Sequence, residues 1–156
     1  MTTRIFLHGL DSSGSGTKGT YFAGRYPDML RPDFHGTLQE RMNQLDQLIS
    51  RYHELIAVGS SFGGLMAVLL AIAQPDRVKR LILLAPALNF HEYRIPDRKI
   101  DTETLVVIGR NDVVTPPDIV IPAARATCSN LQIKVVDDDH LLHTTYRDLD
   151  WDALLS

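Results

Sequence analysis

The chain has 156 residues, of which 44% are hydrophobic and 22% are charged, and its formal net charge is -3. These proportions are typical of globular proteins and exclude disordered and fibrous classes, while the length suits a single domain, 1–156, with one core. A nucleic-acid partner would require clustered basic residues, which this charge does not favour, so we expect a small-molecule ligand instead.

Cysteine content and hydropathy bear on where the protein works. Cys128 is the only cysteine, which excludes an internal disulfide and favours a reducing compartment. The first ten residues contain no apolar stretch long enough for a signal sequence or a membrane span. We therefore expect a cytoplasmic protein without a membrane partner, and the sequence leaves its oligomeric state open.

Short apolar segments alternate with longer segments of helical periodicity, which predicts βαβ units and a parallel sheet. The predicted strands are 4–8, 54–59, 79–85, 104–109 and 131–136. A weak edge strand around 28–34 would bring the sheet to about six strands. Because residues 81–84 and 105–108 are continuously apolar, we expect both segments in a sheet that helices cover on both faces. The expected architecture is a three-layer α/β fold.

Four helices are predicted between and after these strands. They are 37–52, 62–74, a helix that starts at Thr115-Pro116, and a short one over about 148–155. Thr37 is expected to cap the first, with Glu40 completing a capping box, and Thr115 to cap the third. The segment 86–103 has no clear pattern and is expected to be a loop or flap.

The motif Gly59-Ser60-Ser61-Phe62-Gly63 stands between a predicted strand and a nearly all-apolar helix. This G-x-S-x-G pattern is typical of a sharp strand-to-helix turn that exposes a nucleophilic serine, with glycines where side chains would crowd it. A serine-capped turn without chemistry would give the same letters. Of the two serines, only Ser61 has glycines two positions away on both sides, so we predict that Ser61 is the nucleophile.

A serine nucleophile requires a base and a carboxylate that orients the base. Asp112 follows the strand 104–109, and His140 follows the strand 131–136, so both are expected at the carboxyl edge of the sheet together with Ser61. The order serine, acid, histidine is the one this architecture uses. His143 is the competing base, and His140 is favoured because it follows its strand sooner.

With these segments, the sequence resembles the α/β-hydrolase superfamily along almost the whole chain. The matching segments are Leu7-His8-Gly9-Leu10, Gly59 to Gly64, Gln74 to Pro86, Gly109 to Pro116 and Asp139-His140. Among the subgroups, it looks most like the small lidless bacterial esterases of the YqiA type. The chain starts at what is normally the third strand, and it has only about 18 residues where larger members insert a cap domain.

The resemblance implies an oxyanion hole formed by the backbone N–H groups of Leu10 and Phe62, with His8 and Gly9 shaping the loop rather than reacting. It also implies a shallow substrate pocket without a lid. The expected pocket residues are Leu10, Phe62, Phe90, Val113 and Leu141. No cofactor is expected.

Two other motifs point to different chemistry. Gly14 to Gly19 matches G-x-G-x-x-G, and Asp33 follows about 20 residues later, as in dinucleotide-binding oxidoreductases. However, six residues separate Leu7 from Gly14, whereas in that fingerprint the first glycine ends the strand. The run Asp137 to Asp139 beside His140 suggests a metal site, but adjacent side chains point apart, so a solvated turn and no bound metal are expected.

The sequence therefore predicts a serine hydrolase that cleaves small carboxylic esters through an acyl-enzyme on Ser61. A thioesterase or another acyl-transfer enzyme would use the same three residues. A nucleotide-dependent oxidoreductase and a binding module that keeps the fold without catalysis are alternatives of other classes.

Overall fold

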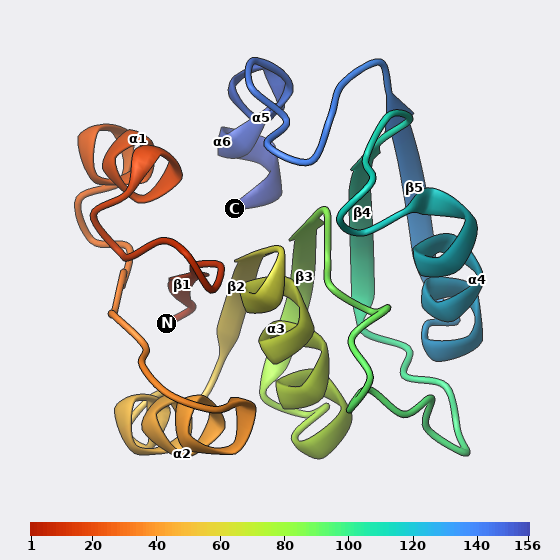
Figure 1. Cartoon of the computed structure of the whole chain (residues 1–156). Helices are drawn as coiled ribbons and strands as arrows, with labels where there is room; N and C mark the ends of the chain where they lie inside the picture. Colours follow the sequence, from red (N-terminus) through yellow and green to blue (C-terminus); the bar gives the residue numbers. More distant parts are fainter.

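A parallel sheet forms the centre of the molecule (Figure 1). The computed structural model describes all 156 residues. Its strands are Thr3–Leu7 (β1), Leu55–Ser60 (β2), Val78–Leu84 (β3), Glu103–Gly109 (β4) and Leu131–Val136 (β5). They lie in the order β1-β2-β3-β4-β5, and every neighbouring pair is parallel. All five predicted strands are confirmed.

Helices cover both faces of the sheet. They are Thr17–Arg25 (α1), Leu38–Ile49 (α2), Phe62–Ala73 (α3), Pro117–Thr127 (α4), Thr145–Asp148 (α5) and Trp151–Leu154 (α6). One buried cluster joins the sheet to α2, α3 and α4, and a second joins it to α1, α5 and α6 (Figure 1). Successive strand side chains alternate between the clusters: Ala57 belongs to the first and Val58 to the second. The three-layer α/β architecture is therefore confirmed.

The helices α2 and α3 form where the periodicity predicts them. Thr37 accepts a hydrogen bond from the Glu40 amide at 3.2 Å, and the Glu40 carboxylate accepts one from the Thr37 amide at 3.1 Å, so the capping box is present. Helix α3 is apolar on nearly every side because it is buried on nearly every side, as its composition indicates. It starts directly after Ser61 and so positions that residue.

The sheet has five strands rather than about six. Of the expected edge strand around 28–34, only Leu30 pairs with the sheet, as an isolated parallel bridge to Ile5. Its amide donates to the Arg4 carbonyl at 2.9 Å, and its carbonyl accepts from the Phe6 amide at 2.8 Å. Pro27 and Pro32 lack the N–H groups that a longer strand would need.

Two helix predictions require correction. Thr115 does not cap α4: the helix begins at Pro117, its N-cap is Pro116, and the Thr115 hydroxyl is bonded to Asp112 instead. The expected last helix over 148–155 is two short helices, α5 and α6, because Leu149 has an extended conformation and interrupts the helical path.

The segment between β3 and β4 contains no helix or strand. Its apolar side chains Leu88, Tyr93 and Ile100 are buried in the cluster that includes α4, and the Tyr93 hydroxyl contacts that of Thr127. The segment is therefore a packed connection where a cap domain would otherwise be inserted. No helix of the structure is long and hydrophobic enough to cross a lipid bilayer.

Candidate active site

Ser61 lies at the sharp turn between β2 and α3. Its backbone has φ 55° and ψ -115°, a conformation that residues with side chains rarely adopt. Hydrogen bonds hold this turn: the Ser61 amide donates to the Leu84 carbonyl at 2.9 Å, and the Ala87 amide donates to the Ser61 carbonyl at 2.9 Å. The strain is therefore fixed by β3 and by the segment that follows it.

The flanking glycines are required because the chain passes too close for side chains. A Cβ at Gly59 would lie 2.4 Å from the Gly63 carbonyl oxygen, and a Cβ at Gly63 would lie 1.9 Å from the Leu7 carbonyl oxygen. Both distances are far inside van der Waals contact. The glycines thus let the start of α3 pack against the end of β1 and place Ser61 above the carboxyl edge of the sheet.

Asp112 and His140 lie next to Ser61, although they come from distant parts of the chain. His140 Nε2 is 3.0 Å from Ser61 Oγ, and His140 Nδ1 is 2.8 Å from Asp112 Oδ2. The Asp112 side chain is fully buried, whereas that of His140 is 19% exposed. This connected series of hydrogen bonds can move a proton from a serine hydroxyl to an imidazole whose ring a carboxylate holds in place.

Asp112 is itself held by the turn that follows β4. Its Oδ1 accepts hydrogen bonds from the amides of Val114 at 2.9 Å and Thr115 at 2.8 Å, and its Oδ2 accepts from the Thr115 hydroxyl at 2.7 Å. The same hydroxyl oxygen is 3.1 Å from His140 Nδ1. Thr115 is not among the predicted site residues. The spacing Asp-x-x-Thr, which favours local side-chain bonds to the backbone, is the signal that could have indicated it.

Two backbone amides near Ser61 have no acceptor within the protein. Phe62 is the first residue of α3, so its N–H has no intrahelical partner, and the Leu10 amide donates no hydrogen bond either. The loop that carries Leu10 is close to the serine, since a Cβ on Gly9 would lie 3.5 Å from Ser61 Cβ. Two backbone N–H groups close to Ser61 are therefore without an acceptor in the protein.

His8 is a buried structural residue with both ring nitrogens occupied. Its Nε2 accepts a hydrogen bond from the Phe34 amide at 2.9 Å, which leaves the proton on Nδ1 to donate to the Gly9 carbonyl at 2.6 Å. Burial lowers the pKa of His8, so the ring stays neutral. These contacts connect the loop after β1 to the segment before α2.

The predicted pocket residues differ in exposure. Leu10, Val113 and Leu141 are exposed to 51%, 86% and 57%, and each is adjacent in sequence to a loop residue of the site. Phe62 is only 3% exposed, and its ring packs edge-on against the half-buried Phe90 at a centroid distance of 5.2 Å. The structure thus brings Phe62 and Phe90 into contact, while Leu10, Val113 and Leu141 are exposed in three different loops.

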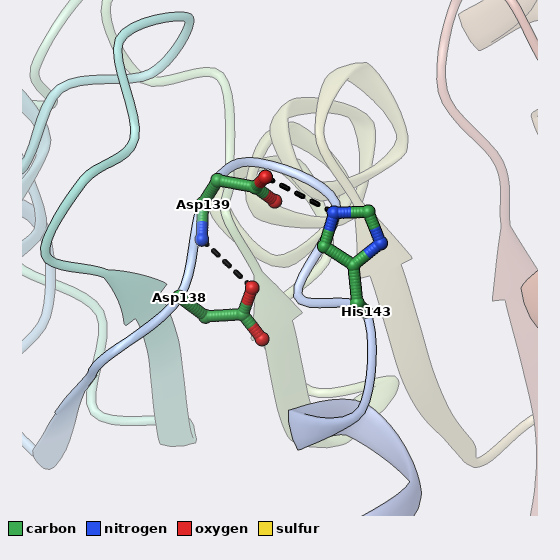
Figure 2. A group of neighbouring side chains, drawn as sticks. All are labelled: Asp138, Asp139 and His143. Atoms are coloured by element: carbon green, nitrogen blue, oxygen red, sulfur yellow. Dashed lines mark hydrogen bonds and ion pairs between the residues drawn. The ribbon is translucent and has the colours of Figure 1, made fainter.

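His143 forms a group with Asp138 and Asp139 (Figure 2), and its hydrogen bond is to Asp139 rather than to Ser61. Its Nε2 is 3.0 Å from Asp139 Oδ2, while Asp138 accepts hydrogen bonds from the Asp139 amide and from the Thr145 hydroxyl, both at 2.8 Å. The potential ligand atoms lie within 4.8 Å of one another. Since they already bond to one another in an exposed turn, the group has an ordinary structural explanation.

The glycine-rich loop before α1 has a structural role. Asp33, the residue that would bind a ribose, accepts a hydrogen bond from the Gly14 amide at 2.7 Å. A Cβ on Gly14 would lie 2.1 Å from the Arg31 carbonyl oxygen, and one on Gly19 would lie 2.1 Å from that of Gly14. Lys18, in the first turn of α1, donates to the Leu141 carbonyl at 2.9 Å, next to His140. The loop thus supports the candidate site.

The family model for the alpha/beta hydrolase fold matches residues 6–102, which is more than half of the chain. The chain belongs to the α/β-hydrolase family. The matched residues of this α/β hydrolase include the loop after β1 and the turn at Ser61, whereas Asp112 and His140 lie beyond them. A comparison with curated proteins gave no match.

Solved structures of other proteins share the fold of this α/β hydrolase. A protein of Pectobacterium atrosepticum described as a YdeN-like hydrolase is 19% identical, with a TM-score of 0.77 and coverage of 99% of this chain and 88% of that one. A thermophilic esterase of Thermogutta terrifontis is 16% identical, with a TM-score of 0.73 and coverage of 99% and 88%. Mouse alpha/beta hydrolase domain-containing protein 10 is 18% identical, with a TM-score of 0.73 and coverage of 99% and 90%.

These identities establish a shared fold and leave the substrate of this α/β hydrolase open. The predicted superfamily and the lidless three-layer fold are confirmed. The closer likeness to esterases of the YqiA type stays a prediction.

Proposed function

We propose that this α/β hydrolase is a serine hydrolase that cleaves small carboxylic esters through an acyl-enzyme on Ser61. The observation that carries the proposal is the continuous contact from Ser61 through His140 to Asp112, at 3.0 Å and 2.8 Å. The esterase of T. terrifontis and a monoacylglycerol lipase of Paleococcus ferrophilus have the same fold, which agrees with this chemistry.

In the proposed reaction, His140 Nε2 accepts the Ser61 hydroxyl proton while Oγ attacks the ester carbonyl carbon. The carbonyl oxygen becomes an oxyanion that accepts hydrogen bonds from the amides of Leu10 and Phe62. Each such donor contributes about 3 kcal/mol to transition-state stabilisation. The carbon–oxygen bond to the alcohol then breaks, and His140 returns its proton to the leaving oxygen.

The acyl group, now on Ser61 Oγ, is released by the reverse sequence. His140 accepts a proton from water, the hydroxide attacks the acyl carbon, and Ser61 regains its proton as the carboxylic acid leaves. Asp112 holds the imidazolium in both halves of the reaction. The same steps would release a thiol from a thioester, so the geometry favours neither leaving group.

Labelling with a fluorophosphonate probe tests the nucleophile. The folded wild-type protein is expected to label stoichiometrically. Labelling should be lost in Ser61→Ala and kept in Ser60→Ala, the matched control one residue away. His140→Ala should slow labelling by a factor of about 10³, while His143→Ala should change it less than about threefold. A folded wild-type protein that does not label would overturn the proposal.

A series of p-nitrophenyl esters tests the substrate size. The expected pocket residues Leu10, Val113 and Leu141 are exposed to solvent, so short acyl chains are expected to give the highest kcat/KM. A steady rise of kcat/KM up to long acyl chains would contradict the assignment to small esters, while leaving the role of Ser61 intact.

A further inference from the structure

Arg41 is a buried arginine that the proposed reaction does not use. It lies in the first turn of α2, and only 6% of its surface is exposed. Its Nε–H donates to the Gly36 carbonyl at 3.0 Å, but Nη1 is buried and has no hydrogen-bond partner. None of the ion pairs of the structure includes Arg41. The Asp11 carboxylate attracts the guanidinium from beyond ion-pair distance, so the guanidinium is buried without an ion-pair partner.

Such an arrangement is costly, because a buried cation loses its hydration and gains nothing comparable from an apolar neighbour. The neighbour here is Phe62, whose ring centre is 5.4 Å from Arg41 Cζ. An aromatic ring compensates part of the charge but accepts no strong hydrogen bond. No protein group therefore satisfies the N–H groups of Arg41 Nη1.

Arg41 is also placed beside the site. Phe62 directly follows Ser61 and supplies one of the two free backbone amides. Arg41 Nε donates to the carbonyl of Gly36, which lies two positions after Phe34. The Phe34 amide in turn donates to His8 in the loop after β1. The guanidinium therefore lies over the ring of Phe62, which packs in turn against Phe90.

Arg41 has a buried guanidinium beside Phe62, without an ion-pair partner and with Nη1 free of any hydrogen bond. From this we infer that the site binds esters that carry an anionic group, a carboxylate or a phosphate. The planar guanidinium suits such groups because its parallel N–H bonds match their paired oxygens. The inference rests on the proposed function, and it narrows the substrate class from small esters to negatively charged ones.

Matched chromogenic esters test the charge preference. The first pair is mono-p-nitrophenyl glutarate and its methyl-capped neutral counterpart, which differ in a charge on the acyl side. The second pair is 3-carboxy-4-nitrophenyl butyrate and p-nitrophenyl butyrate, which differ in a charge on the leaving group. The ratio of kcat/KM, anionic over neutral, is expected to exceed one in at least one pair for the wild-type protein.

Arg41→Met removes the charge but keeps a long apolar side chain over Phe62. It is expected to lower the ratio of the preferred pair roughly tenfold or more, the effect of one charge-assisted hydrogen bond. Arg41→Lys keeps the charge without the planar fork and should give an intermediate ratio. Arg51→Met, at an exposed position just after α2, is the matched control and should leave both ratios unchanged.

The inference is overturned if Arg41→Met and Arg41→Lys leave both ratios within twofold of wild type, as would follow from a buried water on Nη1. Calorimetry with glutarate separates this failure from that of the proposed function. Glutarate should bind wild-type protein at least roughly tenfold more tightly than either Arg41 variant, whether or not Ser61 reacts with a fluorophosphonate. Labelling of Ser61 with no effect of Arg41 on glutarate binding leaves the hydrolase and removes the anion site.

Discussion

Thr115 is the residue that contacts both titratable partners of Ser61. Its hydroxyl donates to Asp112 Oδ2 at 2.7 Å and lies 3.1 Å from His140 Nδ1, and the residue is 1% exposed. A hydroxyl in this position limits how the carboxylate and the imidazole can rotate relative to each other. Thr115 is therefore a positioning residue, which acts through Asp112 and His140.

Replacing Thr115 by valine tests this role because the two side chains have similar shapes. Thr115→Val is expected to lower kcat for p-nitrophenyl butyrate about tenfold, with KM within about twofold, since one hydrogen bond of about 1.4 kcal/mol is lost from the reacting geometry. Thr115→Ser, which keeps the hydroxyl, should recover most of kcat. Equal losses in both variants would mean that the shape and packing of the whole side chain, rather than its hydroxyl, determine kcat.

His8 provides a prediction about pH and stability. Burial lowers the pKa of His8 in the folded protein below the unfolded value of 6.5. At a pH between the folded and the unfolded pKa, the unfolded chain therefore binds more protons than the folded protein. The stability that neutral His8 contributes is complete above about pH 6.5 and is lost as the pH falls through the folded pKa. The free energy of unfolding of the wild-type protein should therefore fall in this range.

His8→Gln keeps an acceptor for the Phe34 amide but removes the titrating group. It is expected to flatten the dependence of the unfolding free energy on pH between about 7.5 and 5, measured by urea unfolding. His53→Gln changes an exposed histidine and should keep the wild-type slope. An unchanged slope in His8→Gln would show that other groups cause the acid sensitivity.

Among the elements, α2 carries Arg41 and depends on the capping box at its start. Thr37→Ala removes the side-chain acceptor for the Glu40 amide and is expected to cost about 1 kcal/mol of unfolding free energy, measured by urea unfolding. Gln47→Ala, an exposed position on the same helix, should change stability by less than about 0.5 kcal/mol. Equal effects of the two substitutions would argue against the cap.

The elements also differ in how well they could be predicted. The capping box of α2 and the apolar helix α3 depend on residues a few positions apart in the sequence, so the sequence pattern predicts both correctly. The predicted start of α4 is too early, because a threonine hydroxyl can cap a helix or bond to a nearby carboxylate, and Thr115 bonds to Asp112. The edge segment around Leu30 is reduced to one bridge since the flanking prolines leave little backbone to pair.

At the scale of the molecule, the two ends of the chain share one layer. Phe22 of α1 is fully buried, and its ring packs against Phe6 of β1 at 5.3 Å and against Trp151 of α6 at 4.8 Å. The Arg4 side chain donates to the Leu155 carbonyl at 2.8 Å. The first and last helical segments therefore cover the same face of the sheet (Figure 1).

Truncating Phe22 tests this arrangement. Phe22→Ala is expected to lower the unfolding free energy by about 3 to 5 kcal/mol, because it leaves a cavity between β1 and α6 that rigid neighbours cannot fill. Ile119→Ala, at a half-exposed position of α4, should cost much less. A loss below about 1 kcal/mol for Phe22→Ala would mean that α1 and the C-terminal helices are not packed together as described.

The sequence by itself determined which edge of the sheet carries the candidate site. Ser61, Asp112 and His140 each follow a separate strand, and the carboxyl ends of parallel strands meet at one edge. It also indicated the family and the steric need for Gly59 and Gly63. Only the tertiary structure decided that His140 rather than His143 lies against Ser61, that the Thr115 hydroxyl lies beside His140, and that Arg41 is buried without an ion-pair partner. These facts depend on which side chains are buried and which groups they contact. The contacts join residues that are far apart in the sequence, so local spacing does not indicate them.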